Sequence, residues 1–197
     1  EAMGLSMPFN GTTPGVDARR KTMSHLTGNR IVELVKEDLK LSSYLTREAM
    51  ENGIRVLAAI GGSTNAVIHL QAIAGRMGID LKLEDFDTIT KDIPLLVDIQ
   101  PSGKYLMEDF HYAGGVPAIL KELGGLMNTG IETVSGKNIG EIAELSEVYN
   151  RDVLRSLESP LKKNAGIWVL KGNLAPRGAI IKPSAATENL LSHEAKA

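Results

Sequence analysis

Apolar side chains recur every three or four positions in two consecutive stretches of the chain, which predicts amphipathic helices over residues 47–60 and 64–77. Thr46 is a good N-cap for the first helix because its hydroxyl can accept a hydrogen bond from a free backbone N–H. Gly78 is a natural C-terminal stop for the second. Both helices carry so many apolar residues that we expect them in the middle of the fold.

The same patterns predict further helices and strands in the rest of the chain. A helix opens at Asp17 and extends to about Leu39, with Gly28 expected to break or kink it. Shorter helices are predicted over residues 83–87, 107–112, 116–123 and 139–145. Short apolar runs between turn signals predict strands over residues 93–99, 131–134, 166–170 and 178–182. This succession predicts an α/β protein in which the last two strands open a second, β-rich domain.

Composition and charge exclude several classes of function. The 197 residues have a formal net charge of −2, so there is no broad electrostatic case for a nucleic-acid partner. No apolar run approaches the ~20 residues needed to span a bilayer, and the first residues lack the features of a signal peptide. We therefore expect a cytoplasmic protein with no membrane partner. The chain has no cysteine, which excludes disulfides, thiolate catalysis and any metal cluster bound through its own thiolates.

The turn between the two central helices carries the first candidate site. Two glycines allow a sharp turn, and the three small polar residues after them suit the start of a helix, whose free N–H groups attract anions. In order, these five residues are Gly61, Gly62, Ser63, Thr64 and Asn65. Asn65 and His69 are four positions apart, so they share a helix face that could border a polar site. A tight, capped helix–helix turn explains the same residues without a ligand, and on these residues alone that interpretation is favoured.

The loop after the predicted strand 93–99 carries the second candidate site. Ligands of open α/β sheets bind at the carboxyl ends of the strands, and Ser102 and Lys104 would lie there. Lys104 could meet a carboxylate or a phosphate at this edge. A solvated loop lysine is an equally good explanation, so both residues are candidates for lining or supporting a site.

Several blocks of sequence, spread in order along nearly the whole chain, point to a family. They are residues 14–20, 31–33, 37–38, 45–49, 61–74, 101–109, 113–117 and 172–176. Together they resemble the dihydroxy-acid and sugar-acid dehydratases, the family that includes 6-phosphogluconate dehydratase. Residues 109–115, 181–186 and 191–194 resemble the aldonate branch, of the arabinonate and xylonate type, more than the branched-chain dihydroxy-acid enzymes.

The resemblance implies a hydro-lyase that removes water from a sugar acid, a 2,3-dihydroxy acid, to give a 2-keto-3-deoxy acid. It also implies an iron–sulfur cluster, [2Fe–2S] rather than [4Fe–4S], acting on the C3 hydroxyl, with Mg²⁺ holding the carboxylate and the C2 hydroxyl. A serine alkoxide takes the C2 proton in the family. The metal ligands and this serine are expected outside the chain, so no catalytic or metal-binding residue is assigned within it. Family members are dimers or tetramers, which predicts a homo-oligomer.

The resemblance further implies that the chain is an internal piece of a longer enzyme and is inactive by itself. Residues 1–127 would form the later part of an α/β/α domain with many helices, and residues 128–160 a linker. Residues 161–197 would be the incomplete start of a β-barrel domain. Two alternatives stay open: a dihydroxy-acid dehydratase of branched-chain amino-acid biosynthesis, and a catalytically inactive scaffold or interaction module built on the same fold.

Overall fold

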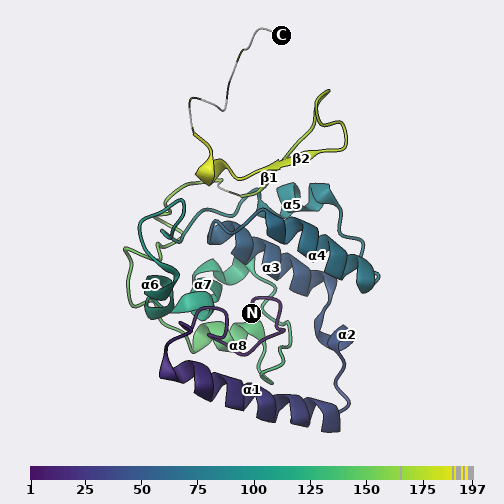
Figure 1. Cartoon of the computed structure of the whole chain (residues 1–197), viewed down its shortest axis with the longest axis vertical. Helices are drawn as coiled ribbons and strands as arrows, with labels where there is room; N and C mark the ends of the chain where they lie inside the picture. The colour runs from purple at the N-terminus through teal and green to yellow at the C-terminus, as the bar shows by residue number, and fades with distance from the viewer. Residues whose placement is uncertain (165, 188, 190–191, 193, 195–197) are drawn as a thin grey trace.

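Helices make up most of the fold in the computed structural model (Figure 1). The structure describes residues 1–164, 166–187, 189, 192 and 194. The longer helices are α1 (Ala18–Lys36), α3 (Arg47–Ala59), α4 (Asn65–Arg76), α5 (Leu83–Thr90) and α7 (Gly115–Leu123). The short elements are α2 (Leu41–Tyr44), α6 (Met107–Tyr112), η1 (Gly124–Leu126), α8 (Ile139–Glu144), β1 (Trp168–Leu170), β2 (Ala179–Ile181) and η2 (Pro183–Ala185). The predicted helices are thereby confirmed, with small shifts of their ends.

Local capping determines where the two predicted central helices begin and end. The Thr46 hydroxyl accepts a hydrogen bond from Ala49 N–H at 3.2 Å, as expected of the N-cap of α3. At the end of α4, Gly78 has a φ of +71°, and Ile79 N–H donates to the Ala74 carbonyl at 2.9 Å. This backbone pattern is the Schellman motif, which a glycine in the left-handed region allows.

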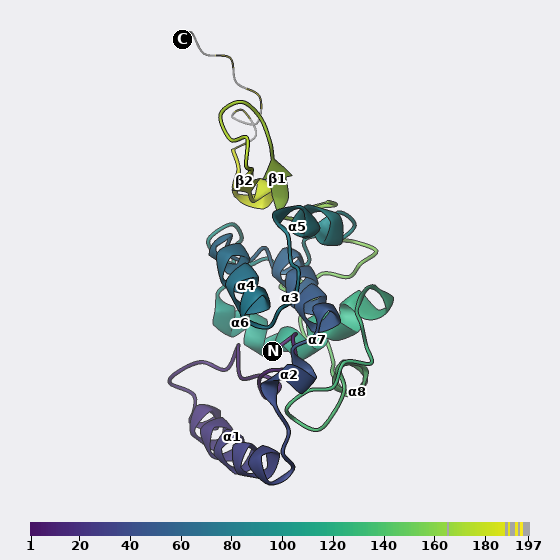
Figure 2. The same cartoon turned by 90° about the vertical axis from the view of Figure 1, so that its right-hand side faces the viewer.

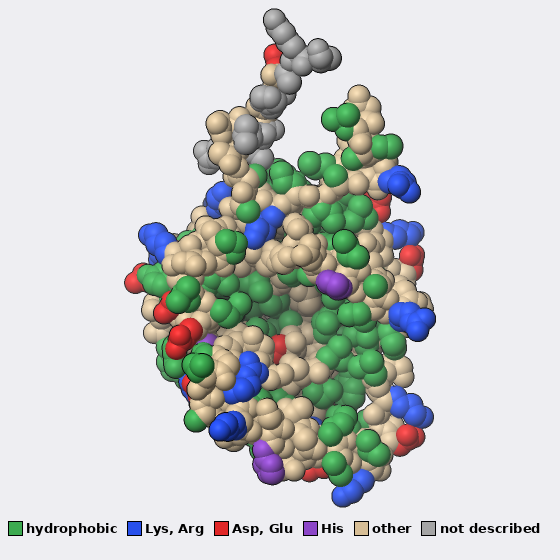
Figure 3. Space-filling model, in the orientation of Figure 1, with side chains coloured by type: hydrophobic (Ala, Val, Ile, Leu, Met, Phe, Trp, Pro, Cys, Tyr) green, Lys and Arg blue, Asp and Glu red, His purple; other side chains and the backbone are tan. Residues whose placement is uncertain are grey.

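Helix α3 is the centre of the molecule because its two sides pack into two different hydrophobic clusters. Its last turns join the 93–99 segment, α7 and α8 in the larger cluster. Met50 and Ile54 join α4, α5 and Ile167 in the second cluster. Helix α4, which we also expected in the middle, lies at the surface instead. Ile68 is 69% exposed and Ile73 38%, and hydrophobic side chains gather over this helix in Figure 3.

Helix α1 differs from its prediction because it is continuous through Gly28. Asp17 caps it by accepting a hydrogen bond from Arg19 N–H, and nothing lies within 4 Å of a Cβ placed at Gly28. One glycine costs a helix only about 1 kcal/mol, which is not enough to break nineteen residues. The helix lies at one end of the molecule, away from β1 and β2, and burial within it is confined to Leu34 (Figure 2).

Two of the predicted strands are not strands in the structure. Residues 93–99 are extended and almost wholly buried, yet they form only isolated bridges, Leu95 to Lys162, Val97 to Leu154 and Ile99 to Tyr105. Residues 131–134 likewise contribute a single bridge, at Glu132. The apolar pattern correctly indicated burial, but a strand also needs a partner that runs alongside it for several residues.

The last two predicted strands are confirmed as β1 and β2. They pair antiparallel with Val169 opposite Ile180 and form the one sheet in the described part of the chain. Two views at right angles place this hairpin beside α5 (Figures 1 and 2), and Ile180 packs against the second cluster. The small sheet fits an α/β fragment, whereas a parallel sheet or a barrel is not seen among the described residues.

Candidate functional site

A cleft of about 800 Å³ lies at the end of α3. Three segments far apart in the sequence form its walls: the turn Ile60–Thr64, the loop Ile99–Pro101 with Met107, and residues 180–182 and 185–187 after the hairpin. The cleft therefore exists only because the C-terminal segment folds back onto the turn between α3 and α4. We call it the turn cleft.

The predicted glycine turn forms one wall of the turn cleft. Gly61 has a φ of +61°, its N–H donates to Ala58, and Gly62 N–H donates to Leu57 at 2.8 Å. These bonds close α3 with a second Schellman motif. A Cβ at Gly62 would collide with the Leu57 side chain. The capped helix–helix turn is thus confirmed, and Gly61 to Thr64 also line the cleft, while their role toward a ligand stays a prediction.

The helix face predicted beyond the turn points elsewhere. Asn65 and His69 are both exposed on α4, and neither lines the turn cleft. Asn65 N–H donates to the Ser63 hydroxyl at 3.2 Å, a local bond of the kind expected at a helix start. A spacing of four residues correctly placed the two side chains on one face. It could not tell whether that face meets the cleft or the solvent.

The loop candidates lie outside the turn cleft as well. Ser102 and Lys104 are exposed, and Lys104 N–H donates to the Asp98 carboxylate at 2.9 Å. Ser102 borders a smaller cavity of about 140 Å³ together with Asp98 and Ser184. The argument that placed them at a sheet edge depended on a parallel sheet, and the described segment 93–99 forms only isolated bridges.

Lys182 is a residue of the cleft that the sequence analysis did not select. Its Nζ donates a hydrogen bond to the Gly61 carbonyl at 2.8 Å, and its side chain lines the turn cleft. Ser184, two residues on, has a buried hydroxyl with no hydrogen-bond partner among the described residues. In the sequence, Lys182 lies at the end of the predicted strand 178–182 and in the block 181–186 that resembles the aldonate branch, and neither feature indicates a contact with Gly61.

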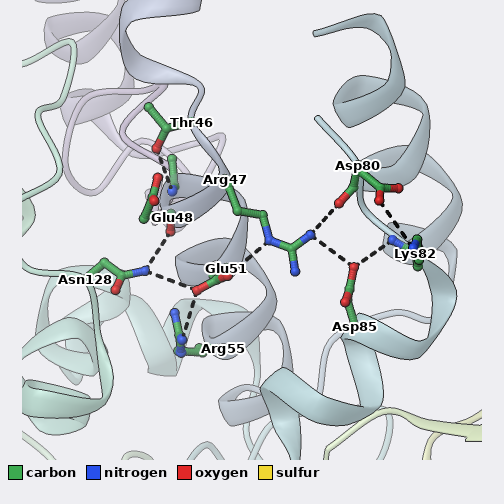
Figure 4. Close-up of polar contacts among 10 residues, drawn as sticks. Thr46, Arg47, Glu48, Glu51, Arg55, Asp80, Lys82, Asp85 and Asn128 are labelled. Atoms are coloured by element: carbon green, nitrogen blue, oxygen red, sulfur yellow. Dashed lines mark hydrogen bonds and ion pairs between the residues drawn. The ribbon is translucent and has the colours of Figure 1, made fainter. Parts of the chain in front are cut away.

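A polar network holds α3 in place behind the cleft (Figure 4). The Arg47 guanidinium donates to Glu51 on its own helix at 3.1 Å and to Asp85 of α5 at 3.0 Å. Burial raises the pKa of Asp85, but the hydrogen bonds from Arg47 and from Lys82 N–H outweigh it and lower the pKa below its usual value. The hydrogen bond to Asp85 is the main reason that the pKa of Arg47 is raised. The network ties the first half of α3 to α5.

A second hollow of about 480 Å³ lies beside α6 and the start of α1. Buried His111 borders it, and its Nδ1 lies 3.1 Å from the Thr12 hydroxyl. Burial lowers the pKa of His111, and the charge of Arg19 lowers it further. Phe9 meets the imidazole edge-on at a centroid distance of 6.0 Å. These contacts give the buried imidazole a hydrogen-bond partner and an aromatic neighbour within the fold. We therefore interpret His111 as a residue that packs the wall of the second hollow.

Two family models cover almost the entire chain. Residues 1–142 match the model described as the dihydroxy-acid/6-phosphogluconate dehydratase N-terminal domain, and residues 152–197 match the corresponding C-terminal model. The chain belongs to the dihydroxy-acid/6-phosphogluconate dehydratase family. The turn cleft of this family member therefore lies between a segment matched by the N-terminal model and a segment matched by the C-terminal model.

Curated relatives match all or nearly all of the chain. IlvD1 of Rhizobium meliloti (strain 1021) is 59% identical over 197 residues, and L-arabinonate dehydratase of Rhizobium leguminosarum bv. trifolii (strain WSM2304) is 54% identical over 199. In both cases the match covers 100% of the chain and 34% of the relative. Dihydroxy-acid dehydratase of Ignicoccus hospitalis is 47% identical over 192 residues, covering 96% of the chain and 35% of the relative. The chain thus spans about a third of the length of these relatives.

The residues around the turn cleft do not fit the metals that the family resemblance implies. Within the described residues, no group of three or more His, Asp or Glu side chains is placed to hold a metal ion. The described lining of the turn cleft contains no carboxylate and no imidazole, which are the usual protein ligands of iron and Mg²⁺ besides thiolates. Among the described helices, none has the length and hydropathy required to cross a membrane.

Proposed function

We propose that this chain is part of a hydro-lyase that converts a sugar acid with hydroxyl groups on C2 and C3 into the 2-keto-3-deoxy acid. The observation that carries the proposal is the 54% identity to L-arabinonate dehydratase across the entire chain, within a family of dehydratases. The hydroxyls of Ser63 and Thr64 and the amide of Gln100 in the turn cleft suit a ligand with several hydroxyl groups.

The proposed reaction breaks two bonds of the substrate. The proton on C2 is removed, the C3–O bond breaks, and hydroxide leaves as water after taking up a proton. The resulting enol then rearranges to the 2-keto acid. Because the C2 proton is weakly acidic and hydroxide is a poor leaving group, both ends of the reacting unit require charge stabilisation. We assign none of these steps to a residue of this chain.

The remaining parts of the proposal concern groups outside the described residues. An iron–sulfur cluster, of the [2Fe–2S] type, and Mg²⁺ would supply Lewis-acid chemistry from ligands elsewhere in the full-length protein. We also propose a cytoplasmic homo-oligomer, a dimer or a tetramer, whose residues 1–127 belong to an α/β domain. Residues 128–160 would then link it to a β-rich domain that opens at residue 161. Residues 165, 188, 190–191, 193 and 195–197 of that domain lie outside the described part.

A dihydroxy-acid dehydratase of branched-chain amino-acid biosynthesis is the second candidate. Relatives with that name are 40–47% identical to this chain, below the 54% of L-arabinonate dehydratase. The apolar part of the turn cleft, formed by Ile60, Ile99 and Met107, supports a substrate with a hydrocarbon end. An inactive scaffold on the same fold is the alternative from another class of function.

One assay of the full-length protein separates these candidates. Purified protein with its metals restored is incubated with a panel of aldonates and with 2,3-dihydroxyisovalerate, and 2-keto acid formation is followed by mass spectrometry. We expect turnover of at least one aldonate at a higher kcat/KM than that of dihydroxyisovalerate. The reverse order would assign the chain to the branched-chain enzymes. A metal-loaded protein that turns over no compound in the panel would favour the scaffold.

A further inference from the structure

The turn cleft contains one charged side chain among its described lining residues, and that side chain is Lys182. The other lining residues are apolar, glycine, or neutral and polar. No ion pair joins Lys182 to a carboxylate within the described part of the chain, although twelve ion pairs occur elsewhere in that part. A half-buried cation without a counter-ion favours an anion in the cleft.

The Lys182 ammonium is also held in a defined place. An ammonium has three N–H donors, and one of them is used by the Gly61 carbonyl at 2.8 Å. That carbonyl is itself fixed, because the Schellman motif at the end of α3 determines the backbone of Gly61. The remaining donors stay available in a cleft of about 800 Å³, large enough for a small sugar acid.

We propose that Lys182 binds the substrate by donating a charge-assisted hydrogen bond to one carboxylate oxygen of the sugar acid, while the other oxygen stays free for an Mg²⁺ ion that residues outside this chain would hold. This inference rests on the proposed function and adds a specificity residue to it. The polar side chains of Ser63, Thr64 and Gln100 line the same cleft and would meet the hydroxyl groups of the bound acid. Lys104, which the sequence offered as one candidate to meet a carboxylate or a phosphate, is exposed and lies outside the cleft.

A purely structural role for Lys182 makes a different prediction. In that case its bond to Gly61 serves only to fasten the segment after β2 to the turn. Removing the ammonium would then lower stability and leave substrate affinity unchanged. Substrate binding predicts the opposite: weaker affinity at nearly constant stability, because a single partly exposed hydrogen bond to a carbonyl contributes little to folding.

The test compares three variants of the full-length, metal-loaded protein. Lys182→Met keeps the length of the side chain and removes its charge, whereas Lys182→Arg keeps the charge. Lys163→Met is the matched control because Lys163 is exposed and does not line the cleft. For each variant, KM, kcat, the dissociation constant of an aldonate from calorimetry, and the melting temperature are measured.

We expect Lys182→Met to raise KM and the aldonate dissociation constant by about 10- to 100-fold, the effect of losing one hydrogen bond to a charged group. Lys182→Arg should recover much of this loss, and Lys163→Met should match the wild type. Unchanged affinity in Lys182→Met, or a lowered melting temperature as its sole effect, would overturn the proposal.

Calorimetry separates this inference from the proposed function. A wild-type protein that binds an aldonate without turning it over would refute the proposed reaction, and the Lys182 variants would still report on the binding role. If the wild type turns over an aldonate while Lys182→Met keeps the wild-type affinity, the reaction stands and the role of Lys182 is refuted. A metal-loaded wild type that binds no sugar acid in the panel would refute both.

Discussion

The Lys182 ammonium donates a hydrogen bond to the carbonyl of Gly61, a residue 121 positions earlier in the chain, at a distance of 2.8 Å. The two residues belong to segments matched by different family models. The bond therefore joins the region of the helical core to the segment that follows the β-hairpin. Because Gly61 also ends α3, the position of the cation depends on the backbone conformation of one glycine.

Gly61→Ala is expected to destabilise the full-length protein by about 1–2 kcal/mol, because an alanine is strained at a φ of +61°. The added Cβ would also lie 2.9 Å from Cδ1 of Leu95, so the core side chain has to shift. A drop in melting temperature checks this expectation. A variant as stable as the wild type would mean that the helix end does not require a left-handed residue.

Gly28→Ala is expected to raise the free energy of unfolding, whereas Gly61→Ala lowers it, and it serves as the matched glycine control. Gly28 lies within continuous α1, and nothing lies within 4 Å of a Cβ placed there. Alanine in an exposed helix should therefore stabilise the protein by about 0.5–1 kcal/mol. Thermal melting measures the difference. A destabilised variant would support the break in the helix that the sequence suggested and the structure does not contain.

Asn52 of α3 makes two hydrogen bonds to the backbone of a later loop. Its side chain is fully buried, donates to the Asn128 carbonyl at 3.0 Å and accepts from Asn128 N–H at 2.8 Å. Asn52→Leu keeps the approximate volume but leaves both backbone groups of Asn128 without their partner, which should cost about 2–4 kcal/mol. Asn29→Leu, on the exposed side of α1, is the control and should cost far less. Equal losses in the two variants would contradict the buried pair.

The sequence predicted the structure correctly where neighbouring residues determine the conformation. Thr46 and Gly78 were identified as helix ends because a cap and a left-handed glycine act within a few residues. The strand predicted over 93–99 was wrong because strand formation depends on distant partners, which here contribute single bridges. Burial of that segment, which depends on its own composition, was predicted correctly.

The same distinction separates the turn residues, which line the turn cleft, from the lysine that the sequence analysis did not select. Residues 61–64 line the turn cleft as the turn chemistry suggested, since a helix-joining turn is a local feature. Lys182 was missed because nothing near it in the sequence indicates that it reaches Gly61. Lys104 was chosen through an assumed sheet edge, and that assumption depended on tertiary contacts which single-sequence patterns do not contain.

Buried His111 should make stability depend on pH. Burial, followed by the charge of Arg19, lowers its pKa in the folded state, so the unfolded state binds a proton more readily. The contribution of the neutral imidazole to the free energy of unfolding is then fully present above the pKa of histidine in the unfolded chain, about 6.5, and it is lost as the pH falls below that value. The charges of Asp17 and Glu108 act in the opposite direction and raise the pKa, but burial and the charges of Arg19 and Arg20 outweigh them.

Replacing His111 should remove this pH dependence. The Gln amide of His111→Gln can still hydrogen-bond to the Thr12 hydroxyl, but it lacks the packing of the imidazole ring, so we expect a lower melting temperature at neutral pH. Because the amide does not titrate, the melting temperature should fall less between pH 7 and pH 5 than in the wild type. Melting temperatures measured across that range test the prediction. His69→Gln is the control because His69 is exposed on α4, and it should keep the slope of the wild type. If His111→Gln has the same slope as the wild type, the pH dependence arises from other groups, and the buried imidazole is not the titrating residue.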